Sequence, residues 1–505
     1  MSKNRSEWSS RTGFVLAAIG SAVGLGNIWR FPYTAASNGG GAFLIPYLVA
    51  LLTAGIPILI LEFAMGHRVK LSAPGAFKKL NKKYEVLGWF QTLITFFIST
   101  YYVVIAAWAM SYAAFALKKA WGQDPEGFLF NNYLQLTDSP LHLGGINTKI
   151  LIPLLIVWGI NYIVLKLGIK DGLEKANKIF MPLLVISLLI IVVRGVTLPG
   201  AVDGLQYFFQ PDFSKLSDPK VWLAAYGQIF YSLSICFSIM LAYSSYLPED
   251  SDIVNNAFIT ALGNCSFSLI SGIGVFSILG YMAYSQGVGV AEVSSAGVGL
   301  AFVVFPKAIN ALPGISSTIV GVTFFMSLIF AGLSSTISIM EPITAAISDK
   351  FNVTRKQALV RFIALAAPLS LIVATKGGLY VLDVVDYSTN QYGIIIAGII
   401  ELVILGWFFN TESIREYANN LSDFGVGKWW TICIRIASII LSVMLILKIV
   451  NEVKSPYGGY SWTVLGIYGV GVMAAMIIGA FVLTAKKGSQ KFEESIATDP
   501  LGREI

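Results

Sequence analysis

The chain has 505 residues, of which 55% are hydrophobic and only 12% are charged. A soluble domain carries roughly a quarter charged residues, so this composition excludes a soluble globular protein and indicates a polytopic membrane protein. The formal net charge of +7 requires no nucleic-acid partner, because most Lys and Arg residues fall between the apolar segments, as membrane topology demands. The chain has only two histidines, and its three cysteines show no metal or disulfide spacing; these features disfavour a metal centre and an enzyme.

Twelve apolar segments reach the length of roughly 20 residues that a helix needs to cross a bilayer. They predict an all-α membrane protein with a tail at 1–10, a first group of five spans within 11–194, a second group of five within 221–408, two further spans within 429–485, and a tail at 486–505. The spans are expected at 11–35, 41–68, 88–117, 149–166, 173–194, 221–247, 253–285, 317–348, 355–374, 379–408, 429–452 and 461–485. An even number of spans puts both termini on one side, and basic tails and connections predict that this side is the cytoplasm, with the chain in the cell membrane.

The first span is interrupted by Gly20-Ser21-Ala22-Val23-Gly24-Leu25-Gly26-Asn27. Unpaired backbone groups are costly in hydrocarbon, so glycines at this depth need an explanation. One explanation is an unwound turn that presents carbonyls and amides to an ion or a charged substrate. The other is close helix packing, because Gly20 and Gly24 form a small-xxx-small pair. This stretch alone leaves both explanations open.

The sixth span contains a second interruption, at 227–238, whose many hydroxyl groups would be unusual on a lipid-facing surface. It lies five spans after the first. Two five-helix repeats that each contribute one broken helix to a site at the membrane midplane produce this arrangement. The loop at 286–316 mixes Gly, Ala, Val and Pro, which is more typical of a helix-containing lid than of a free linker.

These segments resemble the neurotransmitter:sodium symporter family, and within it the prokaryotic amino-acid transporters similar to the bacterial leucine transporter. The resemblance covers nearly the whole chain and is most specific at 20–32, 38–43, 227–237 and 331–335. It implies two inverted five-helix repeats with broken helices 1 and 6. That family is itself a reference case for broken helices, so its agreement with the repeat pattern is not independent evidence.

The resemblance also implies two sodium sites built from hard oxygen donors, the ligands that such an ion prefers. The first takes the Ala22 carbonyl and the side chains of Asn27, Ser232 and Asn264, completed by the substrate carboxylate. The second takes carbonyls of Gly20, Val23 and Ala331 and the hydroxyls of Ser334 and Ser335. The alternatives are that the asparagines only join helices by hydrogen bonds and that the serines bond back to their own helix.

Gly24 indicates the substrate class. Monoamine transporters of the family carry an aspartate at this position, whereas Gly24 supplies no charge, so the substrate should bring its own carboxylate. The resemblance places substrate contacts at Ala22, Gly24, Leu25, Gly26, Ile98, Tyr102, Tyr231, Ser232, Ser234, Phe237, Ser335 and Ile339. This set lacks a side chain charged at neutral pH, which predicts a neutral L-amino acid. Simple helix packing is the alternative role for the apolar members.

Ser268 suggests that chloride takes part. Many prokaryotic relatives have an acidic residue at the matching position, whereas animal members with serine there bind chloride. The implied chloride ligands are Tyr47, Gln228, Ser232 and Ser268. Two sodium ions and one substrate carboxylate leave positive charge in a low-dielectric site, and an anion would balance it. The alternative is that Ser268 is an ordinary serine and that Glu62 compensates the charge.

Gate residues follow from the same resemblance. Arg30 and Asp386 match an outer gate, with Tyr231 as its lid, and Arg5 and Asp349 match an inner gate. Charges within a membrane are costly and are usually paired beside a water-filled path. Glu62 also lies within a span and is expected to cap an interrupted helix.

The sequence therefore predicts uptake of a neutral L-amino acid by alternating access, coupled to sodium, with two sodium ions and a chloride ion. The expected partners are the amino acid and the lipid bilayer. The main alternative is a proton-coupled amino-acid transporter on the same scaffold, which the two oxygen-rich sites disfavour. An ion channel would need no closed substrate pocket, and nothing in the chain resembles an enzyme's nucleophile and base.

Overall fold

The computed structural model describes residues 6–294 and 297–497. Within these ranges the chain is helical, and its only β-type contact is an isolated bridge between Ile146 and Thr375. Ten helical segments are long and apolar enough to cross a membrane, and one bent pair makes an eleventh candidate. The ten are Gly40–Val69, Lys82–Ala116, Thr148–Lys166, Ile169–Val196, Ile253–Gln286, Ser316–Phe351, Arg355–Val373, Gly378–Phe408, Trp429–Gly459 and Trp462–Ala485.

These segments confirm the all-α membrane architecture and coincide with ten of the twelve predicted spans. The other two predicted spans are the broken ones. The bent pair is Arg11–Ala22 with Leu25–Ser37, and its two parts differ in direction by 55°. The predicted sixth span is present as α12 (Pro219–Ser232) and α13 (Ile239–Ser244), each too short to cross a membrane alone.

The first break separates α1 (Arg11–Ala22) from α2 (Leu25–Trp29), which continues into α3 (Phe31–Ser37). Helix α1 begins at Ser10, whose hydroxyl accepts a hydrogen bond from the Gly13 N–H, as an N-cap residue does. It ends where Val23 (φ −79°, ψ 101°) and Gly24 (φ −124°, ψ −167°) adopt extended backbone. The glycine-rich stretch is therefore unwound, as the first of its two explanations predicted.

The second break is held in a strained conformation. Ser234, Cys236 and Ser238 have φ angles of 55°, 67° and 69°, a region that costs a non-glycine residue about 1–3 kcal/mol. Two hydrogen bonds compensate: the Ser234 hydroxyl donates to the Ser21 carbonyl at 2.9 Å, and the Cys236 N–H donates to Glu62 Oε1 at 2.5 Å. The first bond ties the two breaks together, and the second gives Glu62 the capping role predicted for it.

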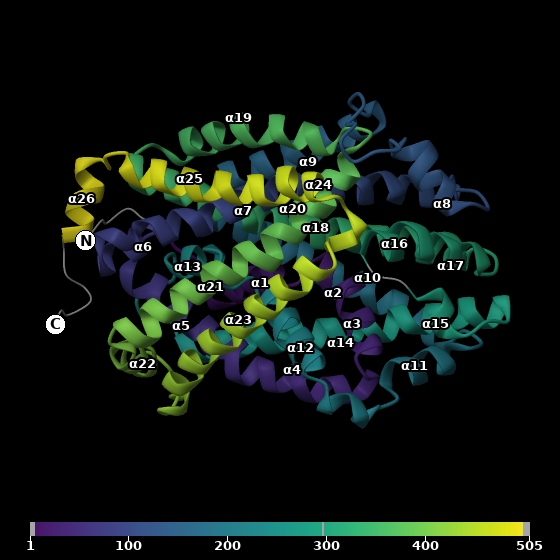
Figure 1. Ribbon diagram of the computed structural model, residues 1–505, viewed down its shortest axis with the longest axis horizontal. Coiled ribbons are helices and arrows are strands. Elements are labelled where there is room, and N and C mark those ends of the chain that lie inside the picture. Colours follow the sequence, from purple (N-terminus) through teal and green to yellow (C-terminus); the bar gives the residue numbers. More distant parts are fainter. Residues whose placement is uncertain (1–5, 295–296, 498–505) are drawn as a thin grey trace.

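Short helices gather at the two ends of the elongated molecule (Figure 1). One end carries α13 together with three others: α6 (Ala73–Leu80), α22 (Thr411–Asn420) and α26 (Gln490–Ala497). The opposite end carries α8 (Pro125–Gly127), α11 (Ala201–Phe209), α15 (Val290–Val293), α16 (Gly297–Gly299) and α17 (Phe305–Ala311). The last three lie in the loop at 286–316, which therefore contains helices, as predicted. Phe302 of this loop packs edge-on against Trp29 of α2, with ring centroids 6.4 Å apart.

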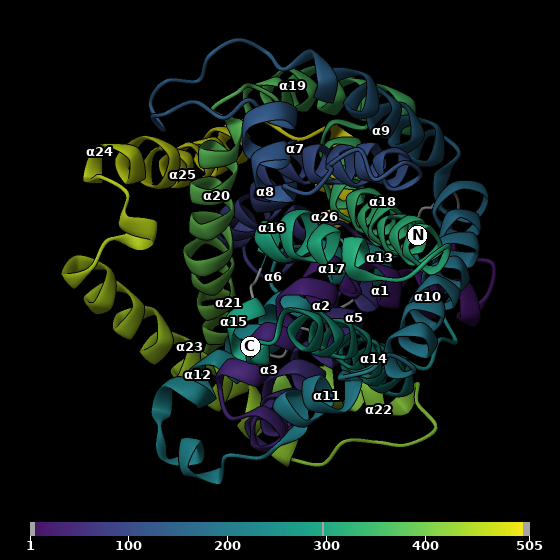
Figure 2. The same ribbon diagram turned by 90° about the vertical axis from the view of Figure 1, so that its right-hand side faces the viewer.

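Viewed from that second end, α1 and α2 lie inside a ring of long helices (Figure 2). The ring contains α9 (Thr148–Lys166), α10 (Lys175–Val196), α14 (Ile253–Gln286), α20 (Gly378–Ser388) and α23 (Trp429–Lys454). In the most apolar stretch of the span that contains α7 (Glu85–Ala116), 78% of the residues are buried within the protein, whereas the corresponding shares for the last two spans are only 22% and 28%. Helices α1 and α2 thus lie in the interior, and α23 and α25 (Gly471–Ala485) lie at the periphery.

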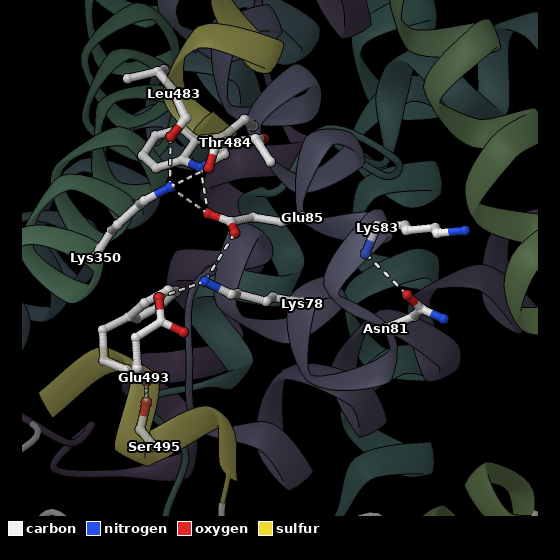
Figure 3. Close-up of polar contacts among 11 residues, drawn as sticks. Lys78, Asn81, Lys83, Glu85, Lys350, Leu483, Thr484, Glu493 and Ser495 are labelled. Atoms are coloured by element: carbon white, nitrogen blue, oxygen red, sulfur yellow. Dashed lines mark hydrogen bonds and ion pairs between the residues drawn. The ribbon is translucent and has the colours of Figure 1, made fainter. Parts of the chain in front are cut away.

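A buried charge cluster fastens α26 to the helices beside it (Figure 3). Lys350, at the end of α18 (Ser316–Phe351), lies 2.6 Å from Glu85 Oε1, and its side chain is 1% exposed. Lys78 of α6 lies 3.1 Å from Glu85 Oε2 and 2.7 Å from Glu493 Oε1 of α26. The same Lys350 ammonium donates to the Leu483 carbonyl at 2.5 Å.

Replacing Lys350 with methionine should lower the thermal unfolding midpoint in detergent by several degrees. Removing one partner of a buried ion pair costs about 3–5 kcal/mol, because the remaining charge stays desolvated. Lys83→Met is the matched control: Lys83 is exposed near the same cluster, and a surface change of this kind is usually within about 0.5 kcal/mol of neutral. Equal midpoints for the two variants would show that the Lys350–Glu85 pair contributes no net stability.

Candidate functional site

A cavity of about 50 Å³ lies between the two helix breaks. A buried water needs roughly 10–15 Å³, so the cavity is large enough to hold more than one water molecule. It is lined by Ser21, Ala22, Gly24, Gly26, Asn27, Ile98, Tyr101, Tyr102, Tyr231, Ser232, Ser234, Phe237, Ser335, Ile339 and Asn390. All the predicted substrate contacts are in this set except Leu25. The Leu25 N–H donates to the Tyr102 hydroxyl at 3.2 Å, which places it beside the cavity wall.

Three lining residues were missed as cavity residues by the sequence analysis. Ser21 lies inside the glycine-rich stretch, and Tyr101 is the neighbour of Tyr102. Asn390 lies one helical turn after Asp386 and donates to its Oδ1 at 2.7 Å. The spacing of Asp386 and Asn390 along one helix face was the available signal, since residues four apart lie side by side.

Glycine is required at two cavity positions because side chains from other helices approach the backbone closely. A Cβ atom on Gly24 would lie 2.9 Å from the Tyr102 hydroxyl and 3.2 Å from Ser335 Oγ. A Cβ atom on Gly26 would lie 2.5 Å from Tyr231 Cε1. Larger residues at these positions would fill the cavity, so the glycines keep the unwound backbone of the first break accessible.

Asn27 joins three helices at the edge of the cavity. Its Nδ2 donates to Asn264 Oδ1 at 2.8 Å, to Ser268 Oγ at 2.8 Å and to Ser232 Oγ at 3.2 Å. Its Oδ1 accepts from the Gly24 N–H at 2.9 Å. The Asn264 Nδ2 also donates to Ser232 Oγ, at 2.7 Å. The three side chains predicted for the first sodium site are therefore in mutual contact and buried.

The residues predicted for the second sodium site behave differently from one another. Ser334 Oγ donates to the Ala331 carbonyl at 3.1 Å, so this hydroxyl bonds back to its own helix. Ser335 Oγ, in contrast, is buried and makes no well-formed hydrogen bond in the described part of the chain, and the Tyr102 hydroxyl lies near it. A buried hydroxyl without a partner costs about 1–3 kcal/mol. Ser335 therefore has an oxygen available for an ion, next to the unwound backbone at Gly24. Gly20 and Val23 lie in and just after the last turn of α1.

The residues predicted to bind chloride include two with unsatisfied donors. The Tyr47 hydroxyl, on α4 (Leu44–Ala50), is buried and makes no well-formed hydrogen bond among the described residues, although Cys265 and Ser268 lie close enough to interact with it. Both polar atoms of the Gln228 amide also lack partners, and Gln228 lies one turn before Ser232 on α12. Ser268 Oγ donates to the Asn264 carbonyl at 3.1 Å. Buried hydroxyl and amide donors with no acceptor are suited to an anion.

The predicted outer-gate residues both approach the cavity, but they make different contacts. The Arg30 guanidinium lies over the Tyr231 ring, 4.4 Å from its centroid, a cation–π arrangement. Asp386 accepts from Asn390. Among the ion pairs of the described ranges, none closer than 4 Å joins Arg30 to Asp386.

Of the predicted inner-gate pair, Arg5 lies outside the described residues. Asp349 Oδ2 accepts from the Ser72 N–H at 2.8 Å, where the chain enters α6. Trp8 anchors the N-terminal segment at the same end of the molecule: its N–H donates to the Tyr246 carbonyl at 3.0 Å, and its Nε1 donates to the Tyr243 carbonyl at 2.9 Å.

Comparison with known proteins gives consistent matches over nearly the whole chain. The model of the sodium:neurotransmitter symporter family matches residues 5–125 and 122–488. An uncharacterized sodium-dependent transporter of Methanocaldococcus jannaschii is 46% identical over 484 residues, which cover 96% of this chain and 98% of that protein. The human sodium- and chloride-dependent GABA transporter 2 is 31% identical over 463 residues, 84% of this chain and 76% of the human protein. The crystal structure of MhsT in complex with L-phenylalanine is similar in fold, with a TM-score of 0.74 and 33% identity over 88% of this chain and 99% of that chain.

Proposed function

The chain belongs to the sodium:neurotransmitter symporter family and is a sodium-coupled symporter, and we propose that it carries a neutral L-amino acid into the cell together with two sodium ions and a chloride ion. The observation that carries the substrate class is the cavity lining. The described residues around the cavity include no Asp, Glu, Lys, Arg or His. A charged side chain of the substrate would therefore be buried without a partner, which is strongly unfavourable.

The carboxylate and ammonium groups of an amino acid have separate partners in this proposal. Gly24 offers no charge to an amine, so the substrate brings its own carboxylate. That carboxylate meets the Gly26 amide, the Tyr102 hydroxyl and the sodium ion held by Asn27. The ammonium group meets backbone carbonyls of the broken helices, which have lost their helical partners. The complex of MhsT with L-phenylalanine supports an amino-acid substrate for a protein of this fold.

Chloride is proposed because of the charge balance and the unsatisfied donors. The carboxylate and ammonium charges of a neutral amino acid cancel, so two sodium ions leave two positive charges in a low-dielectric site, where they are costly. The Gln228 amide is buried without a partner, and the Tyr47 hydroxyl makes no well-formed hydrogen bond, although it lies near Ser268 and Cys265. A chloride ion held by these groups with Ser232 and Ser268 would satisfy the donors and offset one of these positive charges.

Competition for uptake tests the substrate class. Purified protein in liposomes should take up a radiolabelled neutral amino acid, and other neutral amino acids should compete far better than glutamate, lysine or amines that lack a carboxylate. A Gly24→Asp variant should lose this uptake, because its carboxylate would occupy the position of the substrate's own. Better competition by charged amino acids than by neutral ones would contradict the proposed substrate class.

Ser335→Ala should raise the sodium concentration needed for half-maximal uptake by about 10- to 100-fold, the equivalent of losing a bond of about 1.5–3 kcal/mol to a charged group. The reason is that Ser335 Oγ, unlike Ser334 Oγ, is not hydrogen-bonded to a carbonyl of its own helix. Ser327→Ala is the matched control, since the Ser327 hydroxyl lies on the same helix and donates to the Phe324 carbonyl of that helix. An unchanged sodium requirement in Ser335→Ala would remove this residue from the proposed ligands.

A further inference from the structure

Two carboxyl groups and a thiol meet in the protein interior, at the second helix break. Glu62 lies on α5 (Ile56–Val69), Glu401 on α21 (Ile394–Val403), and Cys236 within the break itself. One carboxyl oxygen of each glutamate and the Cys236 sulfur all lie within 4.8 Å of one another. All three side chains are fully buried. None of the roles proposed above for sodium, chloride or substrate uses this cluster.

The hydrogen bonds of the cluster leave one oxygen of each carboxyl group without a partner. Glu62 Oε1 accepts from the Cys236 N–H at 2.5 Å, and Glu401 Oε2 accepts from the Gln91 Nε2 at 2.6 Å. Glu62 Oε2 and Glu401 Oε1 make no hydrogen bond within the described ranges, and neither does Gln91 Oε1, although all three atoms are buried. Each carboxyl group therefore has one oxygen that accepts a hydrogen bond and one buried oxygen that has no hydrogen-bond partner. The Gln91 Oε1 atom on the neighbouring helix α7 also has no partner.

The described residues supply no ion-pair partner for these carboxyl groups. Their recorded side-chain neighbours are Gln91 on α7, which donates to Glu401, and Cys236 in the break, and neither is positively charged. Neither glutamate takes part in an ion pair within the described part of the chain. Two ionised carboxylates at this separation in an apolar interior repel each other strongly, and only one of two such groups stays ionised.

We propose that Glu62 and Glu401 form a proton-binding site that holds one proton between them. One carboxyl group donates an O–H hydrogen bond and the other accepts it, so a single proton satisfies both orphaned oxygens. The pair then carries one negative charge. The backbone N–H of Cys236 and the side-chain amide of Gln91 donate hydrogen bonds to this charged pair. The shared proton links α5 to α21 across the strained break, beside the cavity residues Ser234 and Phe237.

A metal ion is the competing occupant of such a cluster, because two carboxylates and a thiolate are ligands for zinc or cadmium. The hydrogen-bond pattern favours the proton: each carboxyl group already directs one oxygen to an N–H donor, and one proton completes the pair. The experiment must therefore separate the two occupants.

Infrared spectroscopy of the full-length protein in liposomes tests the site without requiring transport. At neutral pH the wild type should show the carbonyl stretch of one protonated carboxyl group, shifted by exchange into heavy water. The signal should be lost in Glu62→Gln and also in Glu401→Gln, because an amide N–H then replaces the O–H donor and leaves the other group ionised. Glu412→Gln is the matched control: Glu412 is 38% exposed and paired with Arg415, so this variant should keep the signal.

Absence of the signal in the wild type, or its persistence in either glutamine variant of the pair, would overturn the shared proton. Calorimetric titration with zinc and with cadmium provides the second arm. Equal heats for wild type and Glu401→Gln are expected. Stoichiometric metal binding by the wild type that Glu401→Gln abolishes would overturn the proposal in favour of a metal site. Because neither readout depends on uptake, failure of this proposal is distinguishable from failure of the proposed function.

Discussion

Replacing Asn27 with alanine should reduce sodium-driven uptake by about 100-fold or more, the equivalent of losing about 3 kcal/mol of interaction with a bound cation. Asn27 supplies a side-chain oxygen to the proposed first sodium site and also caps the N–H of Gly24 at 2.9 Å. The alanine variant loses both functions. It also leaves Asn264 Oδ1 without its 2.8 Å donor. Initial rates of uptake in proteoliposomes at saturating amino acid measure the effect.

Asn161→Ala is the control for a general loss of stability. Asn161 is fully buried on α9, and its Nδ2 donates to the Val157 carbonyl of the same helix, away from the cavity. This variant should keep the wild-type sodium dependence even if less protein is recovered. Wild-type uptake by Asn27→Ala, with the same sodium requirement, would show that Asn27 only joins helices by hydrogen bonds, the alternative role that the sequence left open.

Removing chloride should lower wild-type uptake at least tenfold, and Ser268→Glu should abolish this dependence. At an effective dielectric constant of about 20, a unit charge about 4 Å from another contributes about 4 kcal/mol, more than enough for this effect. A glutamate at 268 would replace the mobile anion with a fixed negative charge, close to the Asn27 amide that now contacts Ser268 Oγ at 2.8 Å. Uptake with chloride replaced by gluconate measures the dependence.

Ser268→Ala distinguishes the effect of adding a negative charge at this position from the effect of losing the serine hydroxyl. It removes a hydroxyl from the proposed chloride site without adding charge, so it should raise the chloride concentration needed and should not relieve the dependence. Equal wild-type uptake in chloride and in gluconate would contradict a chloride site at Tyr47 and Gln228, and the orphaned donors there would need another acceptor.

Much of the fold could be predicted because its signals are local. A run of apolar residues marks each long span whatever its neighbours are, and the ten continuous spans appear where this pattern predicted them. The first break could be located because glycines unwind a helix in their own segment. The hydroxyl-rich sequence indicated the second break. It did not indicate the positive φ angles of Ser234, Cys236 and Ser238. These angles depend on Glu62, which approaches from another helix.

Contacts between distant segments could not be read from local patterns. Lys350 and Glu85 are 265 positions apart, and nothing in either segment indicates that the lysine is buried. The same holds for Glu401, whose approach to Glu62 depends on how α21 packs against the second break. A direct contact between Arg30 and Asp386 was expected from the resemblance, whereas Arg30 lies over Tyr231. A long flexible side chain takes the partner that packing provides.

The family resemblance made it possible to predict which residues gather at the candidate site. The expected substrate contacts line one cavity, apart from Leu25 beside its wall. The resemblance could not show which hydroxyls remain free. Ser334 and Ser335 are neighbours of the same type, yet one bonds to the Ala331 carbonyl and the other makes no well-formed hydrogen bond in the described chain. That difference depends on the turn of one helix relative to the unwound segment.

Accumulation of a radiolabelled neutral amino acid against its concentration gradient, in proteoliposomes with sodium outside and none inside, tests the central claim most directly. The account predicts accumulation that appears only with an inward sodium gradient, that collapses when a sodium ionophore is added, and that is accompanied by inward movement of sodium. Accumulation driven equally well by a proton gradient without sodium, or a sodium flux that is independent of the amino acid, would contradict it.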